Sequence, residues 1–254
     1  TPRGMPICAP TSPSATSTGP PPEGDWIELS NTGDSPASLE GWTLTDHRVA
    51  PFVFPAGTVI PSKAYLVVFC DGLTNLAGLH TAFKLDRDGE TIAIYDPAHR
   101  RVDAVTFGPQ APGFALGRAG VANDWLLTMP TPGTSNTAAQ LAAIAGIRIN
   151  EWLANPQPGD DDWIELFNPD ATRPVALKGL ALATKTTFYR LEANSFIPPG
   201  GFIRLLADEG GGAGHLGFKL PAEGGSFKLL DAFGSEIDRV VYARQAEGVS
   251  EGRL

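Results

Sequence analysis

Residues 25–31 read DWIELSN, and residues 162–168 read DWIELFN. Apolar and polar side chains alternate in the first stretch, so that Ile27 and Leu29 face one way and Glu28 faces the other. A period of two is typical of a half-buried β-strand, whereas an amphipathic helix has a period of about 3.6. Each stretch therefore predicts a strand, and the recurrence predicts that this strand occurs twice.

Further matches follow along the chain in the same order. Residues 65–69 (YLVVF) match residues 202–206 (FIRLL), and residues 80–85 (HTAFKL) match residues 215–220 (HLGFKL). Shorter matches pair Leu39 and Gly41 with Leu177 and Gly179, Ile60-Pro61 with Ile197-Pro198, Val102-Asp103 with Ile237-Asp238, and Gly117-Arg118 with Gly252-Arg253. The offset stays between 138 and 135 throughout. The chain is therefore two copies of one unit.

The amino-acid composition disfavours several classes of protein. The 254 residues include 29 Gly and 23 Pro, which are the two poorest helix formers, so a largely helical fold is disfavoured. The net charge of −9 argues against a nucleic-acid partner, because phosphate binding needs clustered Lys and Arg. No apolar stretch approaches the length of about 18 residues that a membrane span needs. The composition suits short strands joined by tight turns.

Turn residues such as Asp88-Gly89 separate the short strands, and this spacing predicts antiparallel sandwiches. We expect the following organisation: residues 1–24 form an extended Pro/Ser/Thr-rich segment that contributes the opening strand, residues 25–137 and 147–254 form two β-sandwiches, and residues 138–146 form the linker. The linker reads AAQLAAIAG after an Asn-Thr pair, which predicts a short helix with an N-cap and a Gly stop.

The two cysteines are a candidate disulfide. Asn150 and Ala207 stand at the equivalent positions of the second copy, so both cysteines are absent there together. Their joint presence favours a Cys8–Cys70 bond, which would tie the opening strand to a core strand and imply an oxidising compartment. Two unrelated buried thiols are the alternative.

Charged residues also recur in both copies. Glu28 and Glu165 occupy equivalent positions, as do Arg118 and Arg253. A cross-strand ion pair is therefore predicted in each copy, between Glu28 and Arg118 and between Glu165 and Arg253. Paired catalytic carboxylates are disfavoured, because each copy offers a single Glu with no second acid beside it.

Three further features invite a site interpretation. His80 and His215 are equivalent but have no second His or Cys nearby, so a turn residue that bonds backbone is favoured over a metal ligand or catalytic group. Residues 160–162 are three adjacent aspartates, for which a solvated acidic turn is favoured over a calcium site. The glycine-rich residues 209–214 predict a hairpin loop, since no phosphate-loop Lys follows. No motif calls for a cofactor.

The five tryptophans could stack on sugar rings. They are Trp26, Trp42, Trp125, Trp152 and Trp163. Four of them lie in strand patterns, which favours core packing over ligand binding.

Several motifs together resemble the lamin tail domain family in its bacterial tandem form. They are residues 25–31, 39–44, 54–61, 65–68, 80–85, 117–118 and 149–151. The resemblance implies immunoglobulin-like β-sandwiches and extracytoplasmic interaction modules without catalytic residues. The second copy departs from the family pattern at Leu180, where the first copy has Trp42.

The sequence therefore predicts a non-catalytic structural or interaction protein of the cell envelope or exterior. Exposed edge strands make a protein partner or self-assembly the expected mode of binding. The alternative is a polysaccharide-binding module of a larger secreted hydrolase, with the catalytic part elsewhere. We expect an extracytoplasmic location and no cofactor.

Overall fold

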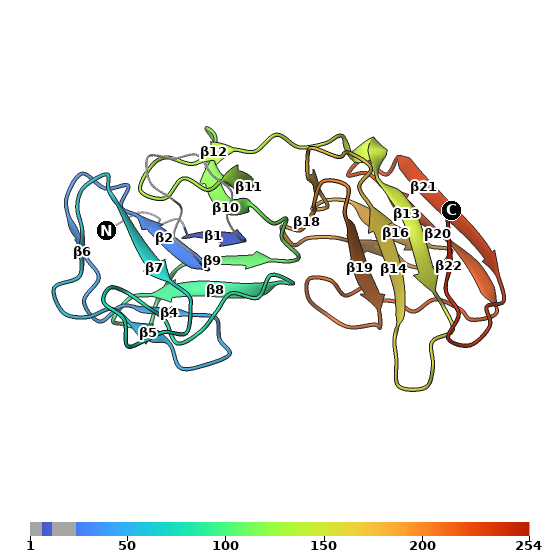
Figure 1. Ribbon diagram of the computed structural model, residues 1–254, viewed down its shortest axis with the longest axis horizontal. Helices are drawn as coiled ribbons and strands as arrows, with labels where there is room; N and C mark the ends of the chain where they lie inside the picture. Colours follow the sequence, from blue (N-terminus) through green and yellow to red (C-terminus); the bar gives the residue numbers. More distant parts are fainter. Residues whose placement is uncertain (1–6, 12–23, 254) are drawn as a thin grey trace. The chain divides into compact units, whose positions relative to one another are not determined.

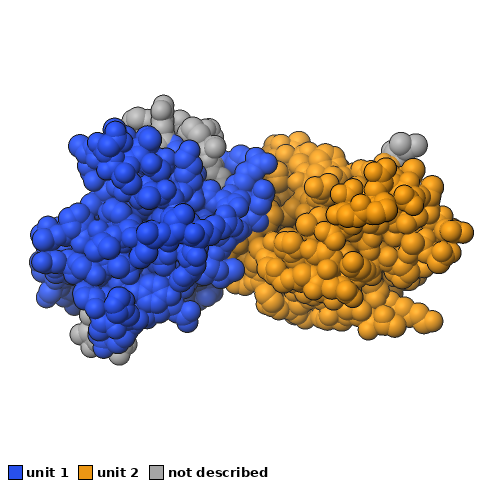
Figure 2. All heavy atoms as spheres, turned by 90° about the horizontal axis from the view of Figure 1, so that it is seen from below, with its two compact units in different colours: residues 1–106, 112–139 blue, residues 107–111, 140–254 orange. Residues whose placement is uncertain are grey.

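The computed structural model describes residues 7–11 and 24–253, which form β-strands joined by turns (Figure 1). The chain folds as two compact units, coloured separately in Figure 2. Unit 1 comprises Thr1–Thr106 and Pro112–Ala139, and unit 2 comprises Phe107–Ala111 and Gln140–Leu254. Each unit is an immunoglobulin-like sandwich of antiparallel sheets. The predicted all-β class with two tandem sandwiches is confirmed.

Unit 1 contains two larger sheets and one two-stranded ribbon. The first sheet has the order β12 (Thr137–Ala138), β11 (Asp124–Met129), β10 (Phe114–Ala119), β1 (Ile7–Thr11), β2 (Trp26–Ser30), β7 (Tyr65–Phe69). The second has the order β5 (Phe52–Val53), β4 (Thr43–Thr45), β8 (Glu90–Tyr95), β9 (Arg101–Phe107). The ribbon pairs β3 (Ala37–Ser38) with β6 (Val59–Ile60).

Unit 2 repeats this plan. Its first sheet has the order β19 (Phe202–Ala207), β14 (Asp162–Phe167), β13 (Arg148–Leu153), β22 (Glu251–Gly252). Its second has the order β17 (Phe188–Arg190), β16 (Ala181–Thr184), β20 (Gly224–Leu230), β21 (Glu236–Ala243), and its ribbon pairs β15 (Val175–Ala176) with β18 (Phe196–Ile197). The order β7-β2-β1-β10 of unit 1 therefore corresponds to β19-β14-β13-β22.

The inner faces of the sheets form the cores. Ile27 and Leu29 on β2 are fully buried, as are their equivalents Ile164 and Leu166 on β14. Burying a side chain of this size contributes about 1.5–3 kcal/mol. The apolar residues that alternate along the sequence are thus the ones that point into the core.

The linker is not the short helix that the sequence predicts. Thr137–Ala138 form β12, the next residues are irregular, and only Ile144–Gly146 make one 3₁₀ turn, η1. The Ala139 N–H donates to the Leu127 carbonyl at 2.9 Å, and the Ala142 N–H donates to the Pro174 carbonyl at 2.8 Å. Each bond ties the chain to the unit on its own side. Since an isolated helix of two turns is marginal in water, these sheet contacts outweigh the local propensity.

The predicted Cys8–Cys70 disulfide is absent, and Cys70 is a free, buried thiol. Strand order explains this, because Cys8 lies opposite Glu28 and Glu28 lies opposite Val67. The strand β2 therefore separates the two cysteine-bearing segments by two strand spacings, about 10 Å. A disulfide needs Cα atoms within about 7 Å. The backbone of β1 is described, whereas the Cys8 side chain and most of the predicted Pro/Ser/Thr-rich segment lie outside the described residues.

We predict that Cys70 resists alkylation in the native protein. Its side chain is fully buried, and this burial raises the pKa of the thiol, so the reactive thiolate is scarce. Peptide mass spectrometry after iodoacetamide treatment should find Cys70 modified only when urea is added. A Cys8–Cys70 cross-linked peptide in a non-reducing digest would contradict the structure.

Candidate functional site

The recurring arginines pair with aspartates rather than with the predicted glutamates. Arg118 Nη2 lies 2.8 Å from Asp103 Oδ1, and Arg253 Nη2 lies 2.7 Å from Asp238 Oδ1. The predicted Glu28–Arg118 and Glu165–Arg253 pairs are therefore wrong, because β1 or β13 lies between the two strands concerned. Each observed pair joins the two sheets of its unit, from β9 to β10 in unit 1 and from β21 to the end of β22 in unit 2. The recurrence of Val-Asp and Ile-Asp fifteen residues before each Arg was the signal for it.

The two recurring glutamates accept hydrogen bonds instead. Glu28 Oε1 accepts the Gly133 N–H at 2.6 Å, and Glu165 Oε1 accepts Asn150 Nδ2 at 2.7 Å. Burial raises the pKa of Glu28 to about 7, although the Gly133 N–H opposes that shift. Neither glutamate has a second carboxylate as a hydrogen-bonded neighbour in the contacts that the structure gives it.

The recurring histidines hold turns. His80 Nδ1 lies 2.8 Å from Asp71 Oδ2, and His215 Nδ1 lies 2.6 Å from Asp208 Oδ2. The His80 ring also stacks on Phe69 at 4.8 Å between centroids, and its Nε2 lies 3.2 Å from the Ala77 carbonyl. The histidines are thus turn residues, as predicted, but their main partner is a carboxylate rather than backbone.

A buried asparagine in each copy was missed from the sequence. Asn31 and Asn168 end the recurring motif and are 3% and 2% exposed. Their Nδ2 groups donate to three carbonyls each: those of Ser35, Ile60 and Pro61 in unit 1, and those of Arg173, Ile197 and Pro198 in unit 2. The recurrence of Asn at this position was the only available signal.

The first residue of the motif has a similar role. Asp25 Oδ2 accepts the Leu85 N–H at 3.2 Å, and Asp162 Oδ2 accepts the Leu220 N–H at 2.7 Å. Asp162 is buried, whereas the preceding Asp160 and Asp161 are exposed, so the three adjacent carboxylates do not converge. Across residues 24–253, the structure shows no group of three or more His, Cys, Asp or Glu that could hold a metal ion.

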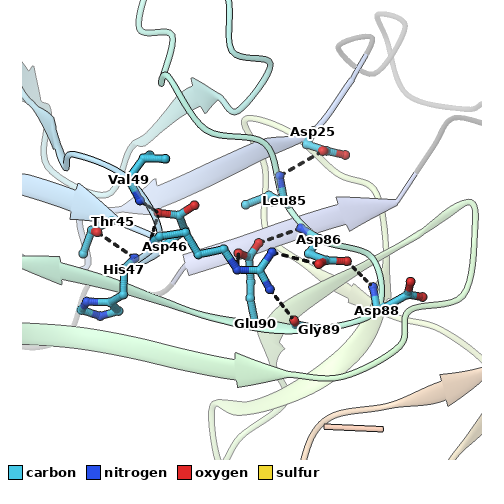
Figure 3. Close-up of polar contacts among 11 residues, drawn as sticks. Asp25, Thr45, Asp46, His47, Val49, Leu85, Asp86, Asp88, Gly89 and Glu90 are labelled. Atoms are coloured by element: carbon cyan, nitrogen blue, oxygen red, sulfur yellow. Dashed lines mark hydrogen bonds and ion pairs between the residues drawn. The ribbon is translucent and has the colours of Figure 1, made fainter. Parts of the chain in front are cut away.

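One acidic cluster occurs in unit 1 alone (Figure 3). Arg48 Nη1 lies 2.9 Å from Asp86 Oδ2, and its Nε lies 3.9 Å from Glu90 Oε2. Glu90 Oε1 accepts the Asp86 N–H at 2.8 Å, while Asp46 Oδ1 accepts the Arg48 N–H at 3.0 Å. Burial raises the pKa of Glu90 to about 7. The cluster holds the loop after β4 against the turn before β8.

Unit 2 has an open groove where unit 1 has this cluster. By strand register, Gly225 is the equivalent of Glu90, and Thr186 is the equivalent of Arg48. A groove of about 670 Å³ is lined by both residues and by Thr184. The loss of two long side chains accounts for the space.

The tryptophans divide into two groups. Trp42 and Trp152 are buried, as core packing predicts, whereas Trp26 is buried on the outer side of its sheet, against Ala115 and Val67. The other two are half-buried: Trp163 on the outward face of β14, under the Arg204 guanidinium at 5.7 Å, and Trp125 on β11, under the Arg118 guanidinium at 4.5 Å. These two rings are the ones available for contact with another molecule.

Fold and contacts together define a tandem β-sandwich protein whose recurring polar side chains hold its own turns and sheet edges. The lamin tail domain family matches residues 10–109 and 140–244, which are most of the chain. The chain belongs to this family, with two tandem copies of the domain. No curated protein and no solved structure matches it. In the described part of the chain, no helix is long and apolar enough to cross a membrane.

We predict that Asn168→Ala destabilises unit 2 by about 2–3 kcal/mol, because three carbonyls lose a shared buried donor. Hydrogen exchange followed by mass spectrometry should show the loss in peptides that cover β18 and β19. Peptides from unit 1 serve as an internal reference. The exposed Asp161→Ala is the control and should change stability by less than about 0.5 kcal/mol. Unchanged protection in Asn168→Ala would contradict the assigned role.

We also predict a pH dependence from Glu90. Its pKa rises from 4.5 to about 7 on folding, so the folded state binds the proton more tightly. The free energy of unfolding therefore falls as pH rises from 4.5 to about 7. Glu90→Gln stays neutral and should lose less stability over this window, by about 1 kcal/mol after solvent screening.

Calorimetry at pH 5 and pH 8 provides the measurement for this variant. The exposed Glu192→Gln is the matched control and should follow the wild-type pH dependence. Parallel pH profiles for Glu90→Gln and the wild type would show that Glu90 ionises normally in the folded protein.

Proposed function

We propose that this protein is a non-catalytic structural or interaction protein of the cell envelope or exterior. One observation carries the proposal. The side chains that recur in both copies and could do chemistry, such as His80 and Glu28, are hydrogen-bonded to the protein's own turns and backbone. The His–Asp contact recurs in both copies, which is expected of side chains that maintain the fold. Membership of the lamin tail domain family supports a role in interaction.

The outer face of the β14–β19 strand pair in unit 2 supports binding to another molecule. Phe202 is 50% exposed and stacks on Phe167 at 4.6 Å between centroids, while Arg204 lies over the half-buried Trp163 ring. Aromatic and Arg side chains are enriched at the centres of protein interfaces. A protein partner or a second copy of the chain is therefore the favoured ligand.

Polysaccharide binding is the second candidate, and the same face favours it. Trp163 and Phe202 present flat rings that could stack on sugar units, as in a binding module attached to a secreted hydrolase. Three of the five tryptophans are buried, which leaves fewer rings for a sugar platform.

We predict that residue-level cross-linking on intact source cells will join this chain to protein. Cross-links to a second copy indicate self-assembly, and cross-links to one other protein indicate an accessory subunit. The purified chain should pass unretained through insoluble polysaccharide columns, including cellulose and chitin. Retention that is lost in Phe202→Thr, together with an absence of protein cross-links, would favour the polysaccharide function instead.

A further inference from the structure

The outer face of the first sheet differs between the two units. In unit 2 we define this outer face by Trp163, Glu165, Phe167, Phe202 and Arg204. Strand register makes their unit 1 equivalents Trp26, Glu28, Ser30, Tyr65 and Val67, in the same order. In both units, residues directly opposite on the paired strands share a face. The two faces can therefore be compared position by position.

A segment of the chain crosses the outer face of unit 1. Residues 130–136 read PTPGTSN, and the Gly133 N–H donates to Glu28 Oε1 at 2.6 Å. The Ser135 hydroxyl lies 3.1 Å from the Tyr65 hydroxyl. Glu28 is only 3% exposed. The outer face of this fold can thus receive an extended polypeptide containing Pro and Gly.

The outer face of unit 2 carries aromatic side chains that are partly exposed. Phe202 is half exposed in the place of Tyr65, and Phe167 stands in the place of Ser30. Glu165 is half-buried and keeps the position of Glu28, but its hydrogen bond comes from the Asn150 side chain. Two stacked phenylalanine rings therefore stand where unit 1 has Ser30 and Tyr65, and the acceptor carboxylate is preserved. Exposed aromatic clusters of this kind mark binding sites.

We propose that the outer face of unit 2 binds an extended, uncharged segment of another polypeptide that contains Pro and Gly. The partner segment contacts β14 and β19 as residues 130–136 contact Glu28 of β2 and Tyr65 of β7 in unit 1. Its proline rings pack on Phe167 and Phe202, and a backbone N–H donates to Glu165. Proline keeps such a segment extended before binding, which lowers the entropy lost on binding. The inference rests on the proposed interaction function and specifies its partner.

A labelled peptide tests the proposal. The probe is the free peptide MPTPGTSNT, which copies residues 129–137, and its fluorescence anisotropy is measured against the full chain. Saturable binding is expected, and Phe202→Thr should weaken it at least about tenfold by removing a central aromatic anchor. Phe188→Thr is the matched control, because Phe188 is 55% exposed on β17 of the other sheet. This control should bind within about twofold of the wild type.

A second peptide tests the hydrogen bond to Glu165. It carries N-methylglycine in place of glycine, which removes the N–H without adding a side chain on the α-carbon. Binding at least about fivefold weaker than the parent peptide is expected. Equal binding of the two peptides would overturn the proposed geometry.

Three outcomes would overturn the proposed peptide binding. They differ in what they imply for the proposed interaction function. Absence of peptide binding alongside protein cross-links in cells would leave the interaction function standing. Self-association that Phe202→Thr abolishes, without peptide binding, would assign the face to a folded second copy. Oligosaccharide binding that Phe202→Thr abolishes, without peptide binding, would replace the interaction function with the polysaccharide one.

Discussion

A buried amide at the end of the central strand determines how each sandwich is built. Asn31 follows β2, Asn168 follows β14, and each Nδ2 group donates to the carbonyls of the Ile-Pro pair that leads into the neighbouring strand. Three carbonyls meet one donor at a site closed to water, so the chain can take only one path there. That path sets the pairing of β2 with β7 and of β14 with β19. The inner and outer faces follow from this register.

Much of the fold could be predicted because its signals are local. The two-residue period identified β2 and β14, and the ordered matches identified two units. Contacts between distant strands could not be predicted in the same way. The Glu28–Arg118 pair and the Cys8–Cys70 bond both require strands that are separated by a third one. Strand order depends on tertiary packing, and recurrence alone does not reveal which recurring residues touch.

The remaining differences arise where the environment outweighs local preference. The Ala-rich linker favours a helix by itself, but two of its backbone N–H groups donate to the Leu127 and Pro174 carbonyls instead. The two units also differ where equivalent backbone positions carry unrelated side chains, as in the Glu90 cluster of unit 1 and the groove at Gly225 of unit 2. The hydrogen bonds that recur in both units preserve the backbone, and they leave the outward positions free to differ. The candidate binding face belongs to that second group, so the repeat pattern could not reveal it.

The way in which the linker is attached also has a mechanical consequence. At the edge of its sheet, β12 is held by two paired residues, Thr128↔Ala138 and Met129↔Thr137. In this sheet β12 pairs with β11 on one side, whereas β2 is flanked by a strand on both sides. We therefore expect β12 to be the strand of this sheet that detaches most easily when the linker is pulled. The chain also passes from unit 1 into residues 107–111 of unit 2 and back, so the two units stay connected through this second segment when β12 detaches.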